Sequence, residues 1–229
     1  MRLLAPDDYS KLNLADQHIE RWMQEKECEW LVEQTEGLHA ICDLGFGDGL
    51  TCRALAKAGH DVTMVDGSID FCAEASFIPG VQAIHAFFED YYPAERYDCV
   101  IASFVLEHVL DPVRLLRSAR RWSDKLIVVV GNANSYHRQI AVKMGLQTHL
   151  DDLSARDVTV GHVRVYSLDT IYEDLLAAGW VPSIERGLGF KPLHNAALAK
   201  LAPNIAKTMM QMEVDPECAA NLFIVAVPE

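Results

Sequence analysis

Short apolar runs alternate with amphipathic segments along most of the chain. The runs lie at residues 40–44, 61–65, 81–86, 98–103, 125–130, 181–185 and 222–227. Between them, residues 51–58, 112–122 and 168–178 carry apolar positions at helical spacing, and Gly59 and Gly179 follow two of these segments as C-caps. Strands that alternate with helices in this way predict a doubly wound α/β sheet of seven strands, with helices on both faces.

Three segments depart from this alternation. Residues 13–36 have helical periodicity before the first strand, and we expect residues 1–36 to form a helical lid. Residues 132–166 are too long for an ordinary connection, and residues 187–220 contain a predicted helix from Ala196 to Met212. We expect both insertions to build a substrate pocket. No repeat or linker interrupts the pattern, so residues 1–229 are predicted to form a single domain.

Composition and charge exclude several classes of protein. Half of the 229 residues are hydrophobic, and 33 acidic residues against 20 basic ones give a net charge of −13. Such a surface repels a nucleic-acid backbone, and the arginines between residues 114 and 121 fit the solvated face of one helix. No apolar run is long enough to span a bilayer, and no signal peptide is recognisable. Six cysteines without a disulfide framework favour a cytoplasmic protein.

The first predicted strand ends in a glycine motif, Asp43-Leu44-Gly45-Phe46-Gly47-Asp48-Gly49. Glycines at every second position let the backbone turn tightly and approach a ligand closely. Asp66 ends the next strand, where a carboxylate can accept hydrogen bonds from both hydroxyls of a ribose. These features predict a nucleoside-bearing cofactor. The third glycine comes one position too early for the dinucleotide pattern Gly-x-Gly-x-x-Gly.

The motif resembles that of the class I S-adenosylmethionine-dependent methyltransferases, which reads acid-x-Gly-x-Gly-x-Gly. Asp66 and Gly67 are similar to the second motif of that family, and residues 105–112 resemble the "LEHV-DP" stretch of its ubiquinone-type and natural-product subgroup. The resemblance covers about residues 37–135. It implies a Rossmann-like sheet, mostly parallel with an antiparallel last strand, and methyl transfer from S-adenosylmethionine.

The resemblance also implies which residues bind the cofactor. Asp66 and Gly67 would hold the ribose, while Asp43 would reach the methionyl end. A sulfonium and an ammonium group both favour such an acidic pocket. The loop from Gly45 through Phe46 and Gly47 to Gly49 would pass beneath the methionine and ribose.

Further cofactor contacts are expected at two strand ends and near the N-terminus. Phe88 would stack on adenine and Glu89 would read its amino group, although core packing is an equal alternative for the phenylalanine. Ser103 and Phe104 would line the cofactor through their backbone. Tyr9 is a candidate contact for the methionyl carboxylate, by family analogy alone.

Three histidines are candidates for a general base, which a hydroxyl acceptor requires and an unprotonated amine does not. His137 is the first choice; it follows the fifth strand in a segment that resembles "PNxxSxxxR", with Gly131 in place of the usual proline. His108 follows the fourth strand, where the Glu107-His108 pair could instead shape the site. His162 belongs to residues 161–166, which resemble "GHxRxY".

The same segments suggest an acceptor site. If residues 162–166 are extended, then His162, Arg164 and Tyr166 share one face. Arg138 and Arg164 would then form a fork for a carboxylate or phosphate, unless they pair with Asp151, Asp152 or Asp157. Apolar residues in the insertions favour a partly hydrophobic small molecule as acceptor. The spacing of His149, Asp151, Asp152 and His162 matches no metal-ligand pattern, so no metal is expected.

The expected function is methyl transfer to an oxygen or nitrogen atom of a small molecule. Two alternatives remain at this stage: an NAD-dependent dehydrogenase that uses Asp66 on the ribose, and a non-catalytic cofactor-binding protein that assists a partner enzyme. The sequence leaves the acceptor and the oligomeric state open.

Overall fold

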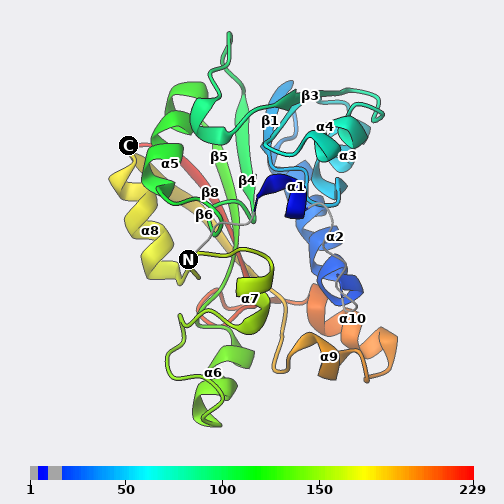
Figure 1. Cartoon of the computed structure of the whole chain (residues 1–229), viewed down its shortest axis with the longest axis vertical. Helices are drawn as coiled ribbons and strands as arrows, with labels where there is room; N and C mark the ends of the chain where they lie inside the picture. The colour runs from blue at the N-terminus through cyan, green and yellow to red at the C-terminus, as the bar shows by residue number, and fades with distance from the viewer. Residues whose placement is uncertain (1–4, 10–16) are drawn as a thin grey trace.

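The computed structural model describes residues 5–9 and 17–229, whose strands form one sheet of eight in the order β3–β2–β1–β4–β5–β8–β6–β7 (Figure 1). Five strands run parallel: β1 (Ala40–Leu44), β2 (Asp61–Asp66), β3 (Val81–His85), β4 (Cys99–Ser103) and β5 (Leu126–Gly131). The remaining strands pair antiparallel: β8 (Asn221–Pro228) with β5 and β6 (Trp180–Leu188), and β7 (Glu213–Val214) with β6. The predicted doubly wound fold is confirmed, with β7 as an additional short strand.

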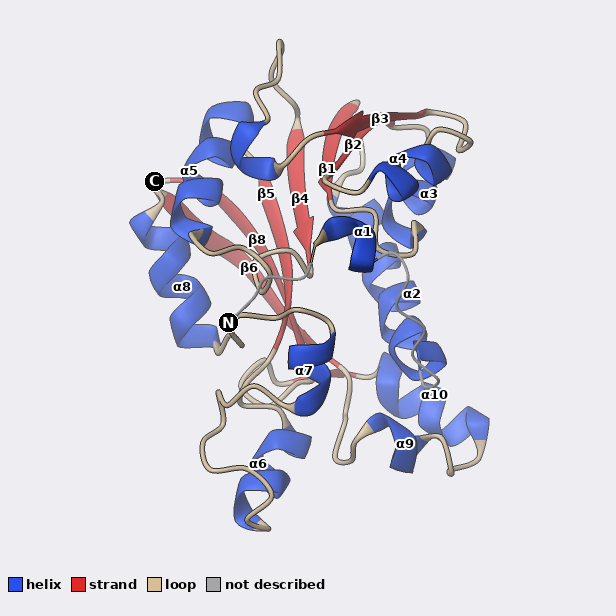
Figure 2. Ribbon diagram, viewed as in Figure 1, coloured by secondary structure: helices blue, strands red, loops and turns tan. Residues whose placement is uncertain are grey.

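Helices cover both faces of the sheet (Figure 2). One face carries α5 (Pro112–Trp122) and α8 (Leu168–Ala177); the other carries α2 (Gln17–Gln34), α3 (Leu50–Lys57), α4 (Ile69–Ala75) and α10 (Pro203–Gln211). Strand β5 shows why both faces are apolar. Val128 and Val130 belong to the core under α5 and α8, whereas Ile127 and Val129 belong to the opposite core.

The predicted helix from Ala196 to Met212 is wrong. The structure has two helices there, α9 (Asn195–Leu198) and α10, which begins at Pro203. Proline lacks an N–H and disfavours a helical residue before it, and Ala202 is extended with φ −57° and ψ 131°. Proline is acceptable at the first position of a new helix, so α10 begins at Pro203, after α9 has ended at Leu198.

The remaining elements lie beyond the strand ends or connect the strands. The insertion at 132–166 contains α6 (Tyr136–Lys143) and α7 (Ala155–Thr159), which lie beyond the carboxyl ends of the parallel strands (Figure 1). The predicted N-terminal helix corresponds to α2, preceded by the short α1 (Pro6–Tyr9). A 3₁₀ turn, η1 (Phe88–Asp90), follows β3. The lid role and the single-domain organisation stay predictions.

Within residues 5–9 and 17–229, no helix combines the length and the apolar character that crossing a bilayer requires. The cytoplasmic location stays a prediction.

Candidate active site

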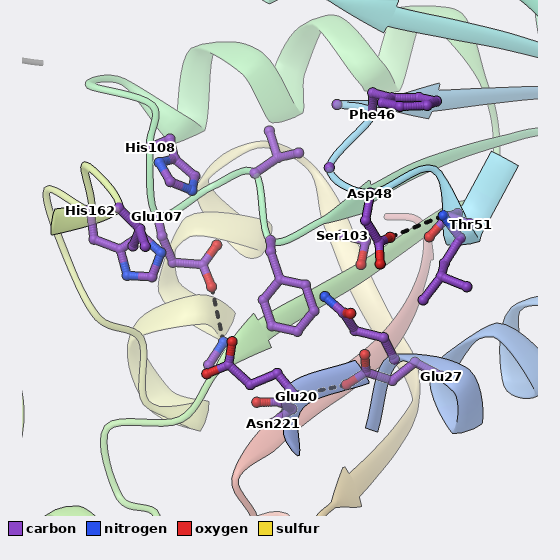
Figure 3. Close-up of a pocket in the computed structure, with 18 of the residues that line it drawn as sticks. Glu20, Glu27, Phe46, Asp48, Thr51, Ser103, Glu107, His108, His162 and Asn221 are labelled. Carbon is purple, nitrogen blue, oxygen red and sulfur yellow. Dashed lines mark hydrogen bonds between the residues drawn. The ribbon is translucent and has the colours of Figure 1, made fainter. Parts of the chain in front are cut away.

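A cavity of about 920 Å³ lies at the carboxyl ends of β1, β2, β4 and β5. Strand β1 has β2 on one side and β4 on the other, so the chain reverses its winding direction there. Ligands of doubly wound sheets bind at such a switch point. Helix α2 and the 154–165 segment complete the walls of the cavity (Figure 3).

The glycine loop forms one wall of this cavity. Gly45, Gly47 and Gly49 have φ values of 82°, 56° and 74°, which side chains with a Cβ rarely adopt. A Cβ on Gly49 would come within 2.6 Å of the Phe46 ring, whereas a Cβ on Gly47 would meet no described atom within 4 Å. Gly47 therefore leaves space open on the cavity side.

Asp66 fixes the glycine loop to the end of β2. Its Oδ2 accepts a hydrogen bond from the Phe46 N–H at 2.8 Å, and its Oδ1 accepts one from the Ser68 N–H at 2.7 Å. Burial raises the pKa of Asp66, although the two amides oppose that shift. Each oxygen retains a lone pair, and the residue lines the cavity, so Asp66 can accept two further hydrogen bonds.

Asp43 presents a buried carboxyl group to the same cavity. It is 1% exposed, and neither of its oxygens has a hydrogen-bond partner among the described residues. Burial, and then the charge of Asp66, raise the pKa of Asp43 well above its usual range. A buried polar group without a partner is costly, and a cationic ligand beside it would remove that cost.

Phe104 directly follows β4 and has an unusual backbone conformation beside the cavity. Its φ of 54° lies in the left-handed region, and its N–H donates to the Val129 carbonyl at 2.8 Å. Strained backbone of this kind clusters at functional sites. Ser103 and Phe104 both line the cavity.

The three candidate histidines all line the cavity, and Figure 3 shows His108 and His162 on the opposite side from Phe46 of the glycine loop. His108 and His162 are in edge contact, with ring centroids 4.7 Å apart. His162 Nδ1 lies 3.0 Å from Asp157 Oδ1, and Asp157 Oδ2 accepts a hydrogen bond from Arg138 at 2.6 Å. Burial opposes ionisation of Asp157, but His162 and Arg138 hold its pKa well below the usual range. This carboxylate therefore stays charged and orients His162.

Sequence comparison decides the family. A family model described as a methyltransferase domain matches residues 19–182, which is well over half of the chain. The chain belongs to the methyltransferase domain family. The expected family, class I S-adenosylmethionine-dependent methyltransferase, and its cofactor are thereby confirmed, which argues against an NAD-dependent dehydrogenase.

Curated relatives of this methyltransferase include ubiquinone biosynthesis O-methyltransferases. The protein of Bradyrhizobium diazoefficiens is 32% identical over 108 residues, and that of Rhodopseudomonas palustris is 31% identical over 113 residues. The aligned regions cover 44% and 47% of this chain. They cover 43% and 44% of the relatives, so the chain spans less than half the length of the curated relatives it matches.

Solved structures share the fold at low identity. Magnesium protoporphyrin IX methyltransferase from Synechocystis, with bound S-adenosylhomocysteine, has a TM-score of 0.65 at 16% identity, over 95% of this chain and 89% of that one. A putative methyltransferase in complex with the Trm112 activator of Haloferax volcanii has a TM-score of 0.66 at 15% identity, over 98% and 97%. Structural similarity at such low sequence identity shows the fold alone.

Most of the predicted cofactor residues line the cavity of this methyltransferase. They are Asp43, Gly45, Phe46, Gly47, Asp66, Gly67, Phe88, Glu89, Ser103 and Phe104. Gly49 shapes the turn instead, because its N–H donates to the Phe46 carbonyl at 2.8 Å. The side chain of Tyr9 lies outside the described residues.

The predicted arginine fork is wrong. Arg164 donates to the carbonyls of Leu106, Val109 and Leu110 and does not line the cavity. The reason is that residues 162–166 are not a strand; they make an isolated bridge between Tyr166 and Asn132.

The other two predicted acceptor contacts also have structural partners. Tyr166 is 2% exposed and donates to Asp174 Oδ2 at 2.8 Å, outside the cavity. Arg138 does line the cavity, but it is 7% exposed and pairs with Asp157, as the alternative interpretation held. The residues predicted to bind an acceptor carboxylate thus have other partners in the structure.

Sequence reasoning missed two buried carboxyl groups of the cavity, Glu27 on α2 and the side chain of Glu107 after β4. A signal for Glu27 exists in the sequence. It lies four residues after Met23 and four before Leu31, so it occupies the apolar face of its helix. Within the described part of the chain, no group of three or more His, Cys, Asp or Glu residues could hold a metal ion.

The histidines of the cavity predict a loss of folding stability in mild acid. Burial and the neighbouring His162 lower the pKa of His108 to about 4; burial, Lys191 and Arg138 lower that of His137 to about 3. In the unfolded chain both titrate near 6.5. Below pH 6.5 the unfolded state therefore binds more protons than the folded state, and acid favours unfolding.

Urea unfolding at pH 7 and pH 5 measures this effect. Between these values the His108→Gln variant should lose about 2 kcal/mol less stability than wild type. Glu27, whose pKa is raised to about 7, acts in the opposite sense in both proteins, so the comparison isolates the histidine. The exposed His39→Gln variant is the control. Equal pH dependence in all three proteins would contradict the assignment.

Proposed function

We propose that this methyltransferase transfers the methyl group of S-adenosylmethionine to an oxygen or nitrogen atom of a small molecule in the same cavity. The observation that carries the proposal is the buried carboxyl of Asp43, which faces the cavity without a partner among the described residues. A volume of about 920 Å³ lies near the top of the range for ligand pockets, which leaves room for a cofactor and a small acceptor.

The residues present fit the cofactor. Asp43 fits a cationic methionyl end, Asp66 has lone pairs for the ribose hydroxyls, and Gly47 leaves room for close approach to the backbone. Phe88 and Glu89 line the same cavity just past β3, which supports their assignment to adenine. When bound, S-adenosylmethionine supplies a methyl group activated by a positively charged sulfur. The chain contributes mainly by aligning the acceptor, a proximity effect worth several kcal/mol.

The glycine loop gives a prediction with a matched control. Gly47→Ala and Gly145→Ala both place a side chain at positive φ, 56° and 70°, where it meets no described atom within 4 Å. Both variants should lose about 1 kcal/mol of folding stability. Of these two glycines only Gly47 lines the cavity. We therefore expect only Gly47→Ala to weaken the binding of S-adenosylhomocysteine, by about tenfold or more. Calorimetric titration measures this; equal affinities for the two variants would show that the cofactor lies elsewhere.

We propose His162 as the general base. Asp157 accepts its Nδ1–H, so Nε2 is left as the proton acceptor. The sequence favours His137, but its pKa of about 3 makes it a weak base at neutral pH, and His108, with a pKa of about 4, is little better. Both can still position the acceptor, since they line the cavity.

The proposed activity is tested with labelled S-adenosylmethionine and a pool of cell metabolites. Wild type should move label into at least one small molecule resolved by mass spectrometry, and the Asp66→Ala variant should not. If wild type binds S-adenosylhomocysteine but transfers no label, the non-catalytic alternative replaces this proposal.

A further inference from the structure

Two buried carboxyl groups are anchored where β5 ends and β8 begins. Gly131 and Asn221 are register partners on β5 and β8. The Gly131 N–H donates to Glu107 Oε1 at 2.9 Å, and Asn221 Nδ2 donates to Glu27 Oε1 at 2.7 Å. Paired positions of β5 and β8 thus anchor Glu107 and Glu27, which come from distant parts of the chain, in the same cavity, and the charge of Glu107 acts on Glu27.

Each of these carboxyl groups has one oxygen left over. Glu27 is 2% exposed and Glu107 is 1% exposed, and the Oε2 of each has no hydrogen-bond partner in the described part of the chain. Figure 3 shows Glu107 on the side of His108 and His162 and Glu27 beside Asn221, with both carboxyl groups directed into the pocket. Two buried acceptors that face one cavity require donors, and a ligand in the cavity can supply them.

The electrostatic surroundings favour a positively charged ligand. Burial raises the pKa of Glu27 to about 7, and the charges of Glu20 and Glu107 add to the shift. Burial also raises the pKa of Glu107, where Asp157 adds to the shift and His162 opposes it. A cation between the two groups would reverse both shifts, whereas an anion would increase them.

The arginines of the cavity are bonded to other groups. Arg138 pairs with Asp157 at 2.6 Å, Arg156 with Glu20 at 2.5 Å and Arg21 with Asp48 at 3.2 Å. Lys191 also lines the cavity, and its charge acts on His137.

We infer that the methyl acceptor carries a protonated amino group, which binds between Glu27 and Glu107. An ammonium group has three donors and no acceptor, so it can satisfy both free oxygens at once. Its apolar part can contact Met23, Phe104, Val109 and Val160, which line the same cavity. The inference rests on the proposed function, because it assigns this half of the cavity to the acceptor.

The donor site has its own acidic group. The charge that acts on Asp43 is that of Asp66, whereas Glu20 and Glu107 act on Glu27. The cavity therefore offers Asp43, at β1, to the cofactor, and the Glu27–Glu107 pair, anchored at β5 and β8, to the acceptor.

The test uses the full chain saturated with S-adenosylhomocysteine, titrated with 2-phenylethylamine, 2-phenylethanol and 3-phenylpropionate. These probes share a phenyl body and differ in the polar group. We expect the amine to bind at least about tenfold more tightly than the alcohol or the acid. Glu27→Gln and Glu107→Gln should each remove most of that preference, whereas Glu29→Gln, at an exposed position on the same helix, should keep it.

A second readout follows protons. Binding of the amine at pH 7 should lower the pKa of Glu27 and release protons to the buffer, so the heat in wild type should depend on the ionisation enthalpy of the buffer. Glu27→Gln should show less of this dependence.

Three outcomes overturn the inference. The first is that the amine fails to bind at millimolar concentration, and the second is that the amine and the alcohol bind equally. The third is that the glutamine variants weaken the binding of S-adenosylhomocysteine and leave the binding of the amine unchanged. Failure of wild type to bind S-adenosylhomocysteine is a different result, because it contradicts the proposed function itself.

Discussion

The Asp66→Ala variant is expected to bind S-adenosylhomocysteine about 30- to 1,000-fold more weakly than wild type. Two charge-assisted hydrogen bonds to ribose hydroxyls would be lost, which together contribute roughly 2–4 kcal/mol. The variant would also release the Phe46 N–H, which Asp66 holds at 2.8 Å, so the glycine loop would lose an anchor. Both effects act in the same direction, which makes this one of the two largest predicted changes.

Calorimetry with S-adenosylhomocysteine measures the change, and circular dichroism confirms that the variant is folded. Asp61→Ala is the matched control, because Asp61 is exposed at the other end of the same strand. The control should bind as wild type does. If Asp66→Ala binds within about threefold of wild type, the ribose does not lie at the end of β2.

The His162→Gln variant is expected to lower kcat by about 100-fold or more, with little change in KM. A hydroxyl acceptor, or an amine that binds as an ammonium, must lose a proton before its lone pair can attack the methyl group. Glutamine at this position can bond to Asp157 but cannot take up that proton. The effect should therefore fall on the chemical step and leave binding nearly unchanged.

Steady-state rates with the labelled acceptor measure this prediction. His137→Gln is the matched control; it changes a cavity histidine whose low pKa of about 3 makes it a weak base, so kcat should fall much less. Asp157→Asn should resemble His162→Gln if orientation of the ring matters. A larger loss of kcat in His137→Gln than in His162→Gln would return the base role to His137.

The proposed donor half of the site follows from the sequence because its parts are local. The glycine loop follows a strand directly, and Asp66 ends the neighbouring strand, so strand order alone brings them together. The hydrogen bond from the Phe46 N–H to Asp66 spans 20 residues. Motif spacing carries enough information for such contacts.

The proposed acceptor half could not be predicted in the same way. The bond between Asn221 and Glu27 joins residues 194 positions apart, and no local pattern encodes it. The sequence places Arg164 at the site only if residues 162–166 are extended. In the structure its guanidinium instead donates to the carbonyls of Leu106 and Leu110, which follow β4. The conformation of the turn after β4 determines where these carbonyls lie. Polar side chains on irregular segments take their partners from tertiary structure, which the periodicity of a sequence does not contain.

Binding of the methyl donor in this cavity is tested by calorimetric titration of wild type with S-adenosylhomocysteine, with NAD as the comparison ligand. We expect saturable binding of S-adenosylhomocysteine at one site and no binding of NAD. Heat from NAD alone, or none from S-adenosylhomocysteine, would contradict it.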